Sequence, residues 1–147
     1  MKYSVSIEID RPLDEVVEKF DNSENLFKWM EGLQKYEHLS GEPGKPGAKT
    51  RLLFQMGKRK IEMIETITVR NLPDEFSATY EAKGVFNIVK NLFKPLDNNR
   101  TLCTNDQEFQ FKGFMKVMGF LMPGAFKKQS LQYLKKFKEF VENTENS

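Results

Sequence analysis

Between Gly32 and Lys112 the sequence consists of six strand-like segments joined by short turns. The turns are the glycine- and proline-rich connector GEPGKPG at 41–47 and the short segments at 57–60, 71–74, 83–84 and 97–100. Parallel strands need long crossover connections, so strands joined this closely must pair antiparallel. A further strand precedes them, because apolar and polar residues alternate from Tyr3 to Ile9. The pattern therefore predicts a seven-stranded antiparallel sheet with strands at 3–9, 33–40, 49–56, 61–70, 76–82, 85–96 and 101–112.

Helical spacing of apolar residues occurs on either side of this strand region. Before Gly32 it predicts two short helices, at 13–20 and 24–30. After Gly113 it returns from Phe114 to Met122 and again from Ala125 to Glu142. Pro123-Gly124 should kink or break this segment, because proline lacks the N–H donor and clashes with the preceding turn. The predicted class is α+β, with a long kinked C-terminal helix against a curved sheet.

The size of these elements predicts a hollow interior. A helix is about 10–12 Å wide, so a single long one cannot fill the concave face of a seven-stranded sheet. We therefore expect a cavity between the sheet and the C-terminal helix.

The chain of 147 residues, 39% of them apolar, suits one domain, expected at 1–142 with a polar tail at 143–147. Its one cysteine cannot form an intramolecular disulfide, which favours a reducing, cytoplasmic location.

Positive charge is concentrated near the C-terminus, although the formal net charge is only +2. From Lys112 to Lys138 there are seven lysines and no acidic residue. This segment is either a solvated helix face or a surface that docks on an anionic membrane. The docking residues would then be Lys127, Lys128, Lys135 and Lys136. The segment contains no arginine, the residue that most often reads bases and clamps phosphates, so we expect no specific nucleic-acid binding.

The order of these elements, with the long helix last, resembles the START-like helix-grip superfamily (SRPBCC). This superfamily includes polyketide cyclases and dehydrases and lipid-transport proteins. Four segments carry the resemblance, which covers nearly the whole chain: IEIDRPLDEVVEKFDN, LFKWMEGL, GEPGKPGAKTRLLF and GFMKVMGFLMPGAFKKQSLQYLKKFKEF. They look like a bacterial branch of the superfamily. The resemblance implies a helix-grip fold with an internal cavity for an apolar or amphipathic small molecule, and it implies no common catalytic residue set.

Glu65 and Tyr80 are the candidate chemical groups. If residues 71–74 form a four-residue turn, Glu65 faces Tyr80 across the hairpin. Their neighbours on that face are then apolar: Met63, Ile67 and Val69 on the first strand, and Phe76 and Ala78 on the second. Burying a carboxylate there is costly unless it is protonated or hydrogen-bonded, so its pKa should be raised and the Tyr80 hydroxyl is its natural partner. In the alternative, Glu65 sits near a rim or bulge and reaches water.

The register of the strand at 85–96 is ambiguous by one residue. With Lys83-Gly84 as a two-residue turn, Asn87 and Asn91 point inward, and the next hairpin adds Asp106 and Glu108. With one more residue in the turn, the inward set is Phe86, Ile88, Leu92, Phe109 and Phe111. A one-residue slip exchanges the two sets. The compact turn favours the first, whereas apolar burial favours the second. The first leaves phenylalanines outside, where a homodimer partner could cover them.

The other candidate residues are assigned from their place in the predicted elements. The predicted ligand-binding set is Trp29, Phe54, Met63, Glu65, Phe76, Tyr80, Asn87, Asn91, Glu108, Met118, Met122 and Phe126. His38 has no second metal ligand near it in the sequence, so we expect no metal site. Cys103 has no activating neighbour and is interpreted as a packing residue.

These features favour a non-catalytic module that binds or transports a hydrophobic or amphipathic small molecule, without a cofactor. One alternative is a cyclase- or dehydrase-type enzyme that uses Glu65 with Tyr80 as acid and base. Another is a co-chaperone-like or membrane-surface interaction protein that uses the lysine-rich helix or the exposed phenylalanines.

Overall fold

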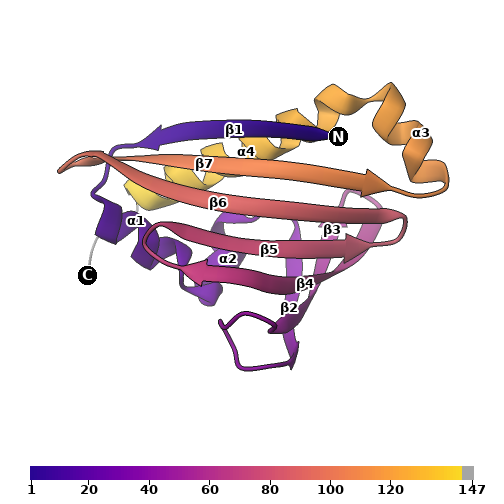
Figure 1. Cartoon of the computed structure of the whole chain (residues 1–147), viewed down its shortest axis with the longest axis horizontal. Coiled ribbons are helices and arrows are strands. Elements are labelled where there is room, and N and C mark those ends of the chain that lie inside the picture. The colour runs from indigo at the N-terminus through magenta and orange to yellow at the C-terminus, as the bar shows by residue number, and fades with distance from the viewer. Residues whose placement is uncertain (144–147) are drawn as a thin grey trace.

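A computed structural model describes residues 1–143, which form one curved sheet and the helices that pack on it (Figure 1). The strands are β1 (Lys2–Ile9), β2 (Leu33–Ser40), β3 (Lys49–Met56), β4 (Arg59–Asn71), β5 (Glu75–Ala82), β6 (Val85–Asp97) and β7 (Arg100–Phe111). The helices are α1 (Leu13–Phe20), the 3-10 turn η1 (Ser23–Asn25), α2 (Leu26–Trp29), α3 (Phe114–Leu121) and α4 (Pro123–Asn143). The predicted tail at 143–147 lies outside the described residues, except for Asn143.

All seven strands pair antiparallel in the order β1-β7-β6-β5-β4-β3-β2. Consecutive strands from β2 to β7 are neighbours because their connections are short, and β1 closes the sheet by pairing with β7. The helix α4 lies across the inner face and packs along β1 (Figure 1). This arrangement confirms the predicted α+β helix-grip fold.

The C-terminal helical region is broken at Pro123, which is one of the two outcomes expected for Pro123-Gly124, and not merely kinked. Pro123 does not kink a continuous helix but begins α4, since proline is compatible with a first helical turn, where its missing N–H has no intrahelical partner. The preceding helix α3 ends at Leu121. Among the described residues, no helix is both long and apolar enough to cross a membrane.

The main core occupies one end of the sheet. There the inner strand residues meet α1, α2 and the C-terminal half of α4, in a cluster of Ile9, Val16, Trp29, Phe93, Cys103, Phe137 and Val141. The ring of Phe20 packs edge-on against those of Phe93 and Phe137, with centroid distances of 5.0 and 5.9 Å. A smaller cluster of Leu33, Leu52 and Phe54 lies on β2 and β3. The interior is therefore solid where three helices converge and open elsewhere.

A bulge in β4 changes which side chains face inward. Ile67 pairs with Ala78 but Val69 pairs with Ser77, so Thr68 is the extra residue. The hairpin turn is then one residue shorter than predicted, and the bulge compensates, so Glu65 still pairs with Tyr80. Beyond the bulge the alternation is inverted. Val69, predicted to face inward, is exposed, and Arg70 points inside instead.

A second bulge, at Leu96, decides the ambiguous register. Strand β6 follows the compact-turn alternative, in which Tyr80 pairs with Asn87 and Ala82 with Val85. In the next hairpin, however, Pro95 pairs with Thr101 and Asp97 with Arg100, which shifts β7 by one residue. The bulge lies beside a proline that cannot donate a ladder hydrogen bond, which is where strand prolines are tolerated. Neither predicted set is therefore complete, because Asn87 and Asn91 face inward together with Phe109.

Candidate functional site

A cavity of about 1410 Å³ lies between the inner face of the sheet and α4. Its walls come from β2 to β7, from α1 and α2, from the first residues of α3, and from α4 between Phe126 and Phe137. Small-molecule pockets are typically about 300–1,000 Å³, so this one has room for a sizeable molecule. The cavity exists because the side chains of one helix do not reach across the whole concave face, as the width of a helix predicted.

Nine of the twelve residues predicted to bind a ligand line this cavity. They are Trp29, Phe54, Met63, Glu65, Phe76, Tyr80, Asn87, Asn91 and Phe126. Their contact with a ligand remains a prediction. Met118 and Met122 are not part of the wall, because α3 turns away from the cavity after Met115.

Glu108 was also placed inside, and this placement is wrong. The bulge at Leu96 turns Glu108 to the outer face, where its carboxylate lies 3.1 Å from the Lys2 ammonium. Hydrogen bonds from Lys2 and Gln110 lower the pKa of Glu108. Asp106 lies on the same face of β7 as Glu108 and is likewise absent from the cavity wall.

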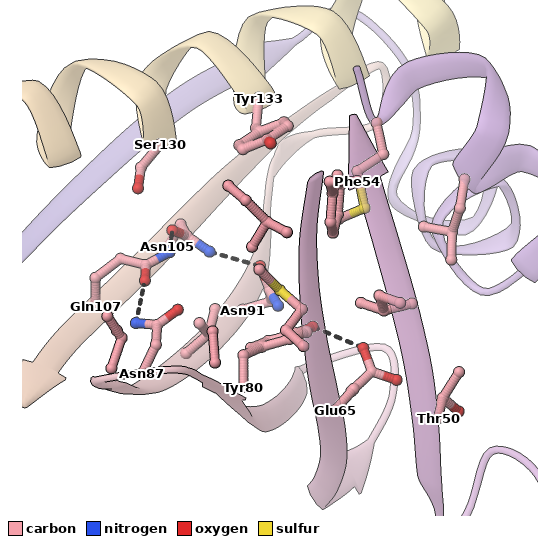
Figure 2. A pocket seen from close by; sticks show the side chains of 18 of the residues that line it. Thr50, Phe54, Glu65, Tyr80, Asn87, Asn91, Asn105, Gln107, Ser130 and Tyr133 are labelled. Atoms are coloured by element: carbon pink, nitrogen blue, oxygen red, sulfur yellow. Dashed lines mark hydrogen bonds between the residues drawn. The ribbon is translucent and has the colours of Figure 1, made fainter. Parts of the chain in front are cut away.

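The Glu65 carboxyl lies on the inner face of β4 and is almost fully buried. The hydroxyl of Tyr80, on the adjacent strand β5, donates a 2.7 Å hydrogen bond to its Oε2 atom (Figure 2). Burial raises the pKa of Glu65, and the hydrogen bond from Tyr80 opposes that rise in part. No cation compensates its charge among the described residues, so the protonated form is favoured more than in water.

Two tyrosines share the environment of Glu65. The pKa of Tyr80 is well above its ordinary value, first because of burial and then because of the nearby Glu65 carboxylate. The pKa of Tyr36 on β2 is raised by burial and by Glu65, while a hydrogen bond with Thr50 opposes this. Both hydroxyls therefore stay protonated at neutral pH and can act as hydrogen-bond donors.

A second polar group, here called the amide ladder, consists of Asn87, Asn91, Asn105 and Gln107 on β6 and β7 (Figure 2). Asn87 donates from Nδ2 to Oε1 of Gln107 at 2.8 Å, and Asn105 donates from Nδ2 to Oδ1 of Asn91 at 2.8 Å. Gln107 in turn donates to Oδ1 of Asn105. Across the cavity, Ser130 and Tyr133 point inward from α4 (Figure 2).

Asn105 and Gln107 were missed by the sequence interpretation. The segment from Thr104 to Glu108 is polar at every position, so its pattern does not reveal which residues face inward. The signal that could have placed them was Phe109 and Phe111, because two aromatic residues on one face of a strand favour burial of that face. Side chains two residues apart point the same way, so Asn105 and Gln107 share that face.

The sequence matches the family described as "Polyketide cyclase / dehydrase and lipid transport" over residues 1–142. The chain belongs to this family. Among curated proteins, none matches the chain significantly.

Solved structures of similar fold share little sequence with this family member. A conserved protein from Geobacillus kaustophilus is 21% identical, with a TM-score of 0.77 over 96% of this chain and 95% of that one. The Zhui aromatase/cyclase from Streptomyces sp. R1128 is 14% identical, with a TM-score of 0.74 over 97% and 93%. Norcoclaurine synthase from Thalictrum flavum, in complex with dopamine and hydroxybenzaldehyde, is 13% identical, with a TM-score of 0.76 over 100% and 89%. At these identities the likeness shows the fold alone.

This member of the polyketide cyclase/dehydrase and lipid transport family has two positions where its cavity offers hydrogen bonds. They are the Glu65–Tyr80 pair and the amide ladder. Within residues 1–143, no group of three or more His, Cys, Asp or Glu side chains could hold a metal ion. The imidazole of His38 lies at the cavity rim and hydrogen-bonds to the carbonyl of Gly41 at 2.8 Å.

Proposed function

We propose that this protein binds and carries an amphipathic small molecule in the cavity between its sheet and α4. The observation that carries the proposal is a volume of about 1410 Å³ with an apolar wall interrupted by the Glu65–Tyr80 pair and the amide ladder. Binding sites of this kind combine apolar walls with a few placed polar groups that orient the ligand. The family name, which includes lipid transport, supports the same function.

Free hydrogen-bonding atoms define the chemical class of the ligand. Within the described part of the chain, Oε1 of Glu65 and Nδ2 of Asn91 have no hydrogen-bond partner in the protein. Neither atom is fully buried, so a ligand in the cavity can reach both. A protonated Glu65 donates to a carbonyl or hydroxyl oxygen, and Asn91 also donates. The ligand is therefore an apolar skeleton that carries two or more carbonyl or hydroxyl oxygens. The chain's single cysteine supports a reducing compartment, such as the cytoplasm, as the place of this function.

Filling the cavity tests the proposal. Val89 lines the cavity from the middle of β6, and the neighbouring Lys90 is exposed on the other face. Val89→Trp should reduce binding of a fluorescent fatty acid or of 1-anilinonaphthalene-8-sulfonate at least about tenfold, since the indole occupies the site. Lys90→Trp is the matched control and should bind like the wild type. Circular dichroism verifies that both variants are folded. Equal binding by the wild type and Val89→Trp, or no binding by the wild type, contradicts the proposal.

A second candidate function is dehydration of a β-hydroxy ketone, because the Glu65 carboxyl has a raised pKa and faces the cavity. Ionised Glu65 would take the proton α to the carbonyl, and the electron pair of that C–H bond would form the new C=C bond. The β-hydroxyl would leave with a proton from Glu65 as water, while the Tyr80 hydroxyl holds the carboxyl in place. Incubation with a β-hydroxy ketone distinguishes the two functions by mass spectrometry. Loss of one water, abolished in Glu65→Gln, indicates the enzyme, whereas an unchanged compound indicates a carrier.

A further inference from the structure

The helix α3 exposes its large apolar side chains to solvent. Phe114 is 75% exposed, Phe120 85% and Leu121 66%. Of the nine exposed large hydrophobic residues in the described chain, five lie between 114 and 122. A helix in a globular protein normally turns such residues inward, and a patch of this kind is a typical interaction site.

Close packing holds α3 in this orientation. A Cβ atom added to Gly119 would lie 2.5 Å from a ring carbon of Phe111, and one added to Gly84 would lie 3.0 Å from the Met115 side chain. The two glycines thus let α3 approach β7 and the β5–β6 hairpin closely. The face that contacts the protein carries Met115, Met118 and Gly119, so the larger side chains have no room there and point outward.

The apolar patch lies at one end of the cavity. Phe114 and Met115 line the cavity together with Lys83 and Lys112. Figure 1 shows α3 beyond the end of β7, at the same end of the sheet as the β5–β6 hairpin. The antiparallel register places the β3–β4 hairpin at this end too, and its Gly57 lies in one groove with Lys128 of α4.

Exposed basic residues surround the patch. They are Lys58, Arg59 and Lys60 in the β3–β4 hairpin, Lys83 in the β5–β6 hairpin, Lys112 and Lys116 beside and within α3, and Lys127 and Lys128 at the start of α4. None of these forms an ion pair with another described residue. The acidic residues near this end are Glu31 and Glu81, while Glu62 is paired with Arg51 and Glu108 with Lys2. The end is therefore strongly basic. We call it the α3 end.

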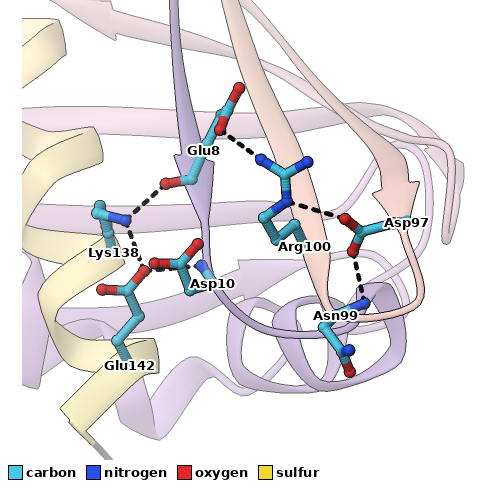
Figure 3. A network of polar contacts seen from close by, with 7 residues as sticks. All are labelled: Glu8, Asp10, Asp97, Asn99, Arg100, Lys138 and Glu142. Carbon is cyan, nitrogen blue, oxygen red and sulfur yellow. Dashed lines mark hydrogen bonds and ion pairs between the residues drawn. The ribbon is translucent and has the colours of Figure 1, made fainter.

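The opposite end of the sheet has a different electrostatic character. There Glu8, Asp10, Asp97 and Glu142 meet Arg100 and Lys138 in one network of polar contacts (Figure 3). Lys138, the last lysine of the basic segment, is held in this network by Glu142 at 2.5 Å and by the Glu8 carbonyl at 2.7 Å. Both cations of this network are thus paired with carboxylates, whereas the eight basic residues of the α3 end are not.

We infer that the α3 end docks on an anionic lipid bilayer, with Phe114, Phe120 and Leu121 inserted among the acyl chains. Apolar side chains bordered by lysines match the two layers that a bilayer surface presents, anionic headgroups above hydrocarbon. A second copy of the α3 end would bring like charges together, so the charge pattern disfavours self-association through this face. This inference extends the proposed carrier function, because docking places the cavity mouth against the source or destination of a lipid-like ligand.

Flotation with lipid vesicles tests the inference. The wild type should bind vesicles of phosphatidylcholine with phosphatidylglycerol, bind pure phosphatidylcholine weakly, and dissociate as salt rises. Phe120→Ser with Leu121→Ser, and separately Lys127→Glu with Lys128→Glu, should each lower the affinity about tenfold or more. The sequence grouped Lys135 and Lys136 with these lysines, but they lie about 12 Å further along α4, away from the patch, and Lys136 pairs with Glu139. Lys135→Glu with Lys136→Glu is therefore the matched control, which changes the net charge equally and should retain nearly full binding.

The outcomes separate this inference from the carrier proposal. Val89→Trp, with its cavity filled, should still bind vesicles, so docking and ligand binding can fail independently. Absence of wild-type vesicle binding, or equal losses in the two lysine pairs, overturns the inference. A concentration-dependent dimer in gel filtration that is lost in Phe120→Ser with Leu121→Ser also overturns it, because a second copy would then cover the patch.

Discussion

The indole of Trp29 packs against the ring of Phe137 with a centroid distance of 4.9 Å and an interplanar angle of 59°. This contact forms the boundary between the solid core and the cavity, since both rings belong to the main core cluster and both line the cavity. About three turns earlier on the same helix, Phe126 packs over Phe109 and Phe111 at the open end. The helix α4 therefore spans a filled half and a hollow half of the protein.

This division predicts unequal effects of the same substitution at two positions of α4. Phe137→Ala should lower the free energy of unfolding by about 3–5 kcal/mol, because the ring is 2% exposed and its removal leaves a void in the solid core. Phe126→Ala should cost less than about 2 kcal/mol, because that ring is only partly buried and borders the cavity. Urea denaturation followed by circular dichroism measures both. Equal losses would show that the open end is as tightly packed as the core.

The raised pKa of Glu65 predicts a pH-dependent stability. Between the ordinary pKa of 4.5 and the higher pKa in the fold, the folded state binds more protons than the unfolded state. Stability of the wild type should therefore fall as pH rises through this window. Glu65→Gln carries no charge at this site and should remove the fall, so its advantage in melting temperature grows from acid to neutral pH.

Glu62→Gln is the control for this pH profile, because Glu62 lies on the same strand but on the exposed face, paired with Arg51. It should leave the slope almost unchanged. A wild-type stability that rises through the same pH window would mean that Glu65 is stabilised as a carboxylate, contrary to its burial.

Removal of the Tyr80 hydroxyl should raise the pKa of Glu65 further. That hydroxyl donates to the carboxylate and is the group that opposes the effect of burial. NMR titration of the labelled Glu65 carboxyl carbon in Tyr80→Phe measures the shift. Tyr36→Phe is the comparison variant, since the Tyr36 hydroxyl hydrogen-bonds Thr50 and not Glu65. A lower Glu65 pKa in Tyr80→Phe would be incompatible with the hydrogen bond described.

Cys103 should react slowly with thiol reagents in the native protein. Burial raises the pKa of its thiol from 9.0 to about 12, with Lys138 opposing slightly, so the thiolate is about a thousandfold scarcer than in the unfolded chain near neutral pH. Labelling with 5,5′-dithiobis(2-nitrobenzoate) should be slow in buffer and rapid in concentrated urea. Rapid stoichiometric labelling of the native protein would show that the cavity admits reagent to this cysteine as a thiolate.

Most of the fold could be predicted because it depends on local rules. Alternation from Tyr3 to Ile9, the short turns after Gly32 and the helical spacing after Gly113 specify strands, antiparallel pairing and the final helices over neighbouring residues. The Glu65–Tyr80 pairing was also predicted, although the turn that led to it is one residue shorter and the bulge at Thr68 restores the register.

The strand residues that were misplaced lie beyond a bulge. Val69 follows the extra residue Thr68, and Glu108 lies opposite a strand shifted by Leu96. A bulge changes side-chain parity at one point and is decided by which face can bury its residues across several strands. The residue pattern of a single strand does not show which face will be buried. In the segment before Phe109 every residue is polar, so the two faces of the strand cannot be told apart from the sequence.

The sequence by itself determined the strand count, the antiparallel pairing of consecutive strands after Gly32, the position of the long helix and the need for a hollow between helix and sheet. These follow from side-chain period, turn length and the width of a helix. Only the tertiary structure decided that Asn105 and Gln107 line the hollow, that Glu108 stays outside, and that α3 turns its phenylalanines to solvent. These outcomes depend on contacts between different elements, such as Gly119 against Phe111 and Gly84 against Met115. The energies of such contacts cannot be deduced from the pattern of neighbouring residues.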